Sequence, residues 1–134
     1  MDVFPGQRPP NVMRQELRET GAISIQEGPF GFLEPAIMEH WPKYKNYGHW
    51  GHSVIPREVW LQIVATWVDL GNSMATEKSA EHVAERAFLF EDVKIEFTRR
   101  FENYKAKLVS MIKELSGWVL HQLSTHTHLT IIGI

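Results

Sequence analysis

Apolar side chains recur at alternating steps of four and three residues through the C-terminal part of the chain. The series consists of Phe97, Phe101, Tyr104, Leu108, Met111, Leu115 and Trp118. Heptad spacing held over about three repeats is typical of a long helix, and we predict one from Val93 to Leu123. At about 1.5 Å per residue it would be roughly 45 Å long. A break near Phe90 to Asp92 would divide this stretch from the helical pattern before it, making two helices rather than one.

A second apolar stripe precedes this series. Pro56 suits the first position of a helix, and the residues that follow repeat at steps of three and four in the order Trp60, Ile63, Val64, Trp67 and Val68. We predict a helix from Pro56 to Leu70 that Gly71 terminates. Because this helix carries two indoles on its apolar face, we expect it to lie in the centre of the fold.

The ends of the chain have a different pattern. The first ten residues contain three prolines and one glycine, which predicts an irregular N-terminal arm over 1–10. The short segment AISI, from Ala22 to Ile25, indicates a strand, and the C-terminal HLTIIGI indicates another. We therefore predict a mainly α protein: a small helical bundle with one long C-terminal helix and a minor two-stranded β element formed by these two segments.

Length and composition limit the class of protein. The chain has 134 residues, of which 43% are hydrophobic and 22% are charged, and we interpret 1–134 as a single globular domain. It contains no cysteine, so a cytoplasmic location is the expectation. No apolar run reaches the roughly 20 residues of a membrane span, and no signal peptide is visible. The net charge of −2 argues against nucleic acid as a partner.

Four aromatic side chains recur at every third position in the segment HWPKYKNYGHWGH, from His40 to His52. They are Trp41, Tyr44, Tyr47 and Trp50. Rings at this spacing make a rigid surface with polar tips, as in the hot spots of protein interfaces. Alternatively, two or three of them fold inward and cap the bundle. Base stacking with lysines on phosphates, or a small-ligand site, would be other uses.

Four of the seven histidines could meet at a metal ion. His49 and His52 bracket a Trp-Gly pair, and His126 and His128 alternate before the last predicted strand. If that strand lay beside the aromatic segment, four imidazoles could converge on zinc. The competing interpretation is that they are polar residues on loops and strand edges. Neither a helical zinc-protease motif nor a Cys/His zinc pattern occurs in the sequence.

The tetrapeptide HLTI, from His128 to Ile131, resembles the His-x-Thr signature of the two-histidine phosphoesterases. In that family the histidine handles protons and the threonine contacts phosphate, so the resemblance implies these roles for His128 and Thr130. It covers only the last few residues. The family carries two such motifs on facing strands, and this chain has no second His-x-Thr or His-x-Ser.

Acidic residues accumulate in the middle of the chain, at Glu77, Glu81, Glu85, Glu91, Asp92 and Glu96. Such a run could line a cleft for a divalent cation. Lysines and arginines are interleaved with these carboxylates, however, which is typical of a solvated helix face with ordinary ion pairs.

These features favour binding over catalysis. No Gly-x-Ser-x-Gly, Walker or dinucleotide-binding motif is present. We predict a small non-catalytic protein-binding module of the inhibitor, immunity or antitoxin type, which occludes a partner protein such as a toxin or nuclease and carries no cofactor. The long heptad stripe could also pair with a copy of itself, giving a homodimer. The alternative is a metal-dependent hydrolase with zinc on the four histidines.

Overall fold

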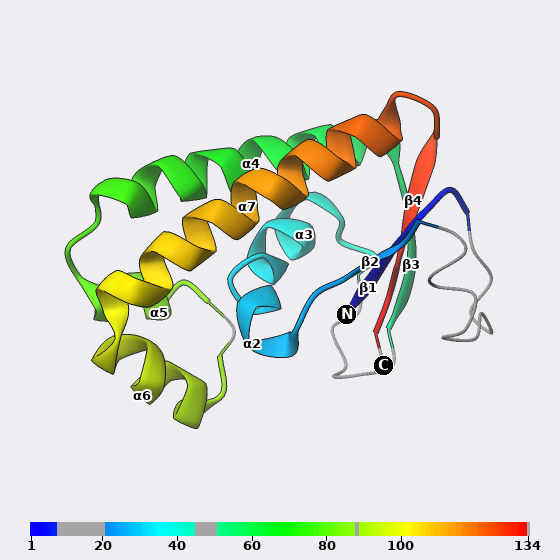
Figure 1. Ribbon diagram of the computed structural model, residues 1–134. Helices are drawn as coiled ribbons and strands as arrows, with labels where there is room; N and C mark the ends of the chain where they lie inside the picture. The colour runs from blue at the N-terminus through cyan, green and yellow to red at the C-terminus, as the bar shows by residue number, and fades with distance from the viewer. Residues whose placement is uncertain (8–20, 45–50, 88, 134) are drawn as a thin grey trace.

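The structure is a computed structural model that describes residues 1–7, 21–44, 51–87 and 89–133. Two long helices lie side by side, and a small sheet stands at one end of them (Figure 1). The described strands are β1 (Asp2–Pro5), β2 (Ile23–Ser24), β3 (His52–Pro56) and β4 (His128–Ile132). The described helices are α2 (Glu27–Phe30), α3 (Glu34–His40), α4 (Arg57–Thr76), α5 (Ala80–Ala84), α6 (Glu91–Arg99) and α7 (Phe101–Leu123). The mainly helical prediction is confirmed at this level.

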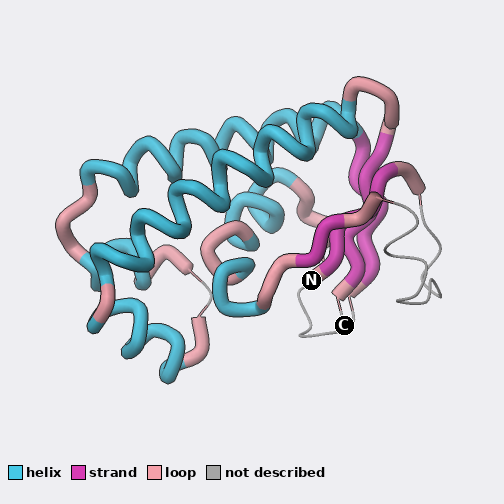
Figure 2. Tube along the Cα trace, in the orientation of Figure 1, coloured by secondary structure: helices cyan, strands magenta, loops and turns pink. Residues whose placement is uncertain are grey.

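The sheet has four antiparallel strands in the order β2-β1-β4-β3, so the predicted two-stranded element is wrong in its strand count. The segment AISI does contain a strand, but it pairs with β1 and not with the C-terminal strand. β1 lies between them, with Val3 opposite Ile131 of β4. The sheet stands at the opposite end of the long helices from α5 and α6 (Figure 2).

The predicted irregular arm over 1–10 is wrong for Asp2–Pro5, which forms β1 and is buried throughout. Prolines and glycine dominated that prediction, but Pro5 is the last residue of the strand and removes only one ladder donor. Gly6 follows with a φ of 76°, the left-handed region that favours glycine. These two residues end the strand rather than prevent it.

Helices α4 and α7 run antiparallel and form the main helical layer (Figure 1). The buried face of α4 includes Trp60, Ile63 and Trp67, each fully buried, as its apolar stripe predicted. The predicted end at Gly71 is wrong, because α4 continues to Thr76. A Cβ at Gly71 would lie 3.2 Å from Cγ2 of Ile112 on α7. The glycine is therefore a point of close approach between two helices.

The predicted helix from Val93 to Leu123 is two helices in the structure. They meet at Arg100, whose φ of −116° and ψ of 37° leave the helical region. The predicted break near Phe90 to Asp92 is also present: α5 ends at Ala84, and Phe90 is the N-cap of α6. The break at Arg100 changes the direction of the chain and brings the ring of Phe97 to 5.6 Å from that of Phe101, edge to face. Contacts between aromatic rings thus accompany the bend.

The heptad series lies inside the domain. Leu108 and Leu115 of α7 are buried, but Ile112 and Val119 are buried in place of Met111 and Trp118, which are half-buried. A helix that packs within one domain keeps a period of 3.6, so its buried stripe drifts away from a 3.5-residue repeat. Because the stripe packs against α4, it offers no support for a homodimer formed through it.

None of the helices in the described part of the chain combines the length and the apolar character that a membrane span requires.

Candidate functional site

The aromatic segment of the 40s is described only in part. Tyr47 and Trp50 lie outside the described residues. Trp41 follows the last residue of α3 and is half-buried, and the ammonium group of Lys43 lies 5.5 Å from the centre of its ring. Tyr44 is buried, with 8% of its surface exposed. Its ring belongs to the core, which corrects the expectation that Tyr44 faces a partner.

Tyr44 is held by a buried carboxyl group. Its hydroxyl donates a hydrogen bond of 2.7 Å to Oε1 of Glu34, in the first turn of α3. Burial raises the pKa of Glu34, the hydrogen bond from Tyr44 opposes that rise, and the nearby charge of Glu27 adds to it. Burial likewise raises the pKa of Tyr44. The pair joins the 40s segment to α3 and is a structural element of the core.

The structure does not bring the predicted metal ligands together. His52 begins β3 opposite Ile132, whereas His128 begins β4 opposite Pro56. The two histidines are therefore at opposite ends of the ladder, about 13 Å apart along the strands. Nδ1 of His126 lies 3.0 Å from the carbonyl oxygen of Gln122. His49 is outside the described residues, and the described ranges contain no group of three or more metal-ligating side chains.

The threonine of the His-x-Thr motif has a structural role in the sheet. Thr130 is fully buried in the centre of the sheet, and its hydroxyl donates a hydrogen bond of 2.8 Å to the carbonyl oxygen of Gly6. Nδ1 of His128 lies 2.9 Å from Oγ1 of Thr127. A buried hydroxyl in this position cannot contact a phosphate, so the geometry does not support the role that the resemblance implies.

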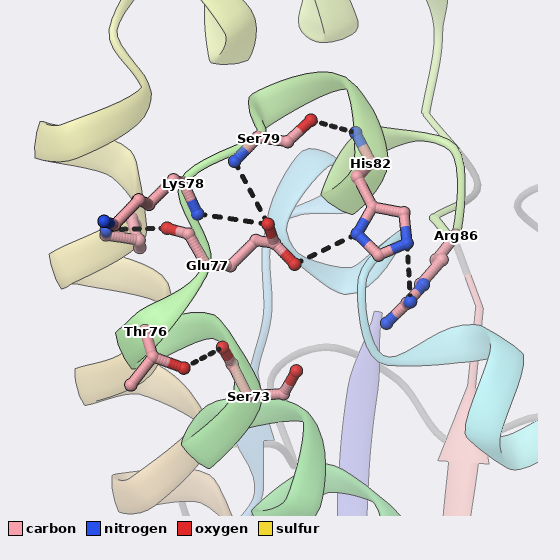
Figure 3. Close-up of polar contacts among 8 residues, drawn as sticks. Ser73, Thr76, Glu77, Lys78, Ser79, His82 and Arg86 are labelled. Carbon is pink, nitrogen blue, oxygen red and sulfur yellow. Dashed lines mark hydrogen bonds and ion pairs between the residues drawn. The ribbon is translucent and has the colours of Figure 1, made fainter.

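Two members of the acidic run, Glu77 and Glu96, make hydrogen bonds or ion pairs within the fold. Glu77 follows α4, and its Oε1 accepts hydrogen bonds from the backbone N–H groups of Lys78 and Ser79, at 3.0 and 3.1 Å. Its Oε2 lies 3.0 Å from Nδ1 of His82 (Figure 3). Nε2 of His82 lies 2.7 Å from the guanidinium of Arg86. Since a guanidinium only donates, Nε2 accepts from Arg86 and Nδ1–H donates to Glu77.

This network connects the end of α4 to α5 and α7. The side chain of Ser79 accepts a hydrogen bond from the backbone N–H of His82, the capping pattern of a helix start (Figure 3). The ammonium group of Lys105 on α7 donates to the carbonyl oxygen of Glu77 at 3.0 Å. The hydrogen bond from His82 is the main reason why the pKa of Glu77 is lowered. No pattern in the sequence predicted this role for His82.

A groove of about 430 Å³ separates α2 from α6 and reaches α7. This volume is in the range of ligand and side-chain binding sites. Its lining consists of Gln26, Gly28, Pro29, Phe32, Asp92, Val93, Glu96, Phe97, Tyr104 and Leu108. The lining is therefore mostly apolar, with carboxylates from one helix.

The interior of this groove is aromatic. The ring of Phe97 lies 4.9 Å from that of Phe32 and 6.4 Å from that of Tyr104. Asp92 and Glu96 follow one another by one turn of α6 and line the groove on that side. The carboxylate of Glu96 also pairs with Arg99 at 2.6 Å and with Arg100 at 3.1 Å.

Helix α6 is the wall of the groove that carries exposed apolar residues. Of its nine residues only Phe97 is buried. Ile95 is 61% exposed and its N-cap Phe90 is 62% exposed, the highest values among the large hydrophobic side chains that the structure describes. Sequence reasoning assigned this stretch to a long helix and so missed the groove. Within VKIEF, Val93 and Phe97 are four residues apart on one face of a helix and line the groove, whereas Ile95 between them is exposed.

The comparisons with known proteins do not assign the chain to a family. No protein-family model matches the sequence, and neither the curated proteins nor the solved structures gave a match.

Proposed function

We propose that the protein is a small non-catalytic module that binds another protein through the α6 surface, by which we mean Phe90, Ile95 and the groove between α2 and α6. The observation that supports this most directly is the exposure of Phe90 and Ile95 at 62% and 61% on the helix that walls the apolar groove. Single exposed apolar residues are ordinary, but these two belong to α6 or its N-cap, and other residues of α6 line an apolar groove. Exposed apolar surface that adjoins such a groove through one helix is typical of a contact site.

The energetics favour burial of these residues against a partner. Complete burial of a Phe or Ile side chain is worth about 1.5–3 kcal/mol, and within this fold most of that gain is not realised for Phe90 and Ile95. The lining of the groove combines apolar side chains with two carboxylates and an amide. Such a site suits the central anchor of a protein interface, surrounded by a polar rim.

The role that we propose is occlusion of a partner protein, as inhibitor, immunity and antitoxin proteins do. The composition supports this class: the domain is small, lacks cysteine and has a net charge of −2. A toxin or nuclease with a basic face would be attracted by that charge. Trp41, Tyr47 and Trp50 remain a predicted second contact.

The experiment is capture of a partner from extracts of the source cells by purified wild-type protein and by variants. We expect Phe90→Ser and Ile95→Ser to reduce capture strongly while the melting temperature changes little, since both side chains are exposed. Gly28→Leu fills the groove, because a Cβ at that position would already lie 3.4 Å from Cγ1 of Val93. It is expected to abolish capture.

The matched control is Leu120→Ser, which removes an apolar side chain of 46% exposure from α7. This variant should capture the partner as the wild type does. Equal loss of capture in Leu120→Ser and Ile95→Ser, or retention of capture in Gly28→Leu, would contradict the proposed surface.

A further inference from the structure

We infer that the groove between α2 and α6 receives an arginine side chain from a basic segment of the partner. This inference rests on the proposed function and adds the chemistry of the group that is bound. It follows from the combination of an aromatic interior with carboxylates along one wall.

The interior of the groove suits the stem and the plane of an arginine. Phe32, Phe97 and Tyr104 line it together with the aliphatic side chains of Val93 and Leu108. Methylene groups gain from apolar contacts, and a guanidinium packs over an aromatic face more readily than an ammonium group does. Arginine is also enriched in the centres of protein interfaces.

The charge of the lining selects a cation. The two charged side chains that line the groove, Asp92 and Glu96, are both carboxylates. They are four residues apart on α6, so their Cβ atoms are about 5–6 Å apart on one face of the helix. A planar guanidinium with five N–H donors can reach both, which a compact ammonium group does less well.

Neither Asp92 nor Glu96 forms a strong ion pair within the described residues. Asp92 has no ion-pair partner among residues 1–7, 21–44, 51–87 and 89–133. Glu96 pairs with Arg99 and Arg100, whose side chains are 65% and 57% exposed. Exposed pairs of this kind contribute little to stability, so an incoming guanidinium can share or replace them.

The test uses three tripeptides that differ only in the central side chain: acetyl-Ala-Arg-Ala-amide, its citrulline analogue and its norleucine analogue. Citrulline keeps the shape of arginine without the charge, and norleucine keeps only the stem. Each is titrated into the full-length protein and followed by ¹H–¹⁵N NMR. We expect saturable shifts at Val93, Phe97 and Tyr104 with the arginine peptide, and about tenfold weaker binding of the citrulline peptide, since charged hydrogen bonds are about twice as strong as neutral ones.

Asp92→Asn should remove the preference for arginine over citrulline. Glu102→Gln, which changes an exposed carboxylate outside the groove lining, should leave it unchanged. Equal binding of the three peptides, tighter binding of norleucine, or no shift in the groove would overturn the inference. If Gly28→Leu and Ile95→Ser still fail to capture the partner, each of these results contradicts only the arginine inference and not the proposed function. Failure of the inference and failure of the proposed function are therefore distinguishable.

Discussion

The hydroxyl of Tyr44 donates a 2.7 Å hydrogen bond to Oε1 of Glu34, and both side chains are buried. Tyr44, which was predicted to face a partner, is thus part of the core. There its hydroxyl provides a hydrogen-bond donor for the buried carboxyl group of Glu34. Burial of an unsatisfied polar group costs about 1–3 kcal/mol. The pair therefore contributes to the way the stability of the fold depends on pH.

Replacement of Glu34 by glutamine should flatten that dependence. Burial raises the pKa of Glu34 above 4.5 in the folded state, so the folded protein binds more protons than the unfolded chain just above this pH. The contribution of Glu34 to the free energy of unfolding is complete below pH 4.5 and falls as the pH rises through the folded-state pKa.

Urea denaturation of the wild type and Glu34→Gln between pH 4 and pH 8 measures this difference. The free energy of unfolding of the variant, minus that of the wild type, should increase with pH. A constant difference across the range would show that Glu34 titrates with the same pKa in both states. Tyr44→Phe is a companion variant and should cost about 1–3 kcal/mol.

Two glycines provide a matched test of the contact between α4 and α7. A Cβ at Gly117 would meet no atom within 4 Å, whereas a Cβ at Gly71 would lie 3.2 Å from Cγ2 of Ile112. Gly117→Ala should stabilise the protein by about 0.5–1 kcal/mol through helix propensity. Gly71→Ala should lose that gain and destabilise the protein, because Ile112 is buried and has to move. Equal stabilisation by both substitutions in urea would contradict the close approach.

The indole of Trp67 makes a buried hydrogen bond that phenylalanine cannot replace. Its Nε1–H donates to the carbonyl oxygen of Leu33 at 2.9 Å, and its ring lies edge to face with that of Trp60 at 5.9 Å. Trp67→Phe should therefore cost about 2–4 kcal/mol, for the unsatisfied carbonyl and the smaller ring. Trp118→Phe, at a half-buried position of α7, is the control and should cost less than half as much. Similar melting temperatures for the two variants would show that this hydrogen bond is dispensable.

The Glu77–His82 hydrogen bond should be visible in the titration of the carboxyl group. The imidazole of His82 is the main cause of the lowered pKa of Glu77, so His82→Ala should raise that pKa toward 4.5. Side-chain ¹³C NMR of Glu77 between pH 2 and pH 7 measures the change. An unchanged carboxyl pKa in His82→Ala would mean that the imidazole does not act on Glu77.

The sequence predicted those parts of the fold that depend on local periodicity. The stripe around Trp60 and Trp67 predicted the buried helix α4, and Pro56 predicted where it starts. The strand β1 could not be predicted, since its pairing with the C-terminal strand joins Val3 to Ile131 across the whole chain. Long-range partners of this kind leave no periodic signal in a four-residue segment.

The candidate site was harder to predict than the fold, because it depends on a break in a helix. Apolar spacing continued from Phe97 to Leu108 and predicted one helix, yet the chain turns at Arg100. Only this turn separates α6 from α7 and opens the groove against α2. Because α6 is a short peripheral helix, Phe90 and Ile95 are exposed.

Site-specific photo-crosslinking tests the proposed contact surface most directly, because it reports which face touches a partner without relying on changes in stability. p-Benzoylphenylalanine would replace Phe90 or Ile95 on the α6 surface, and Leu61 or Leu120 as exposed apolar positions on α4 and α7. In extracts of the source cells, we predict one crosslinked protein from positions 90 and 95 and none from positions 61 and 120. Crosslinks from positions 61 and 120 alone would contradict the account.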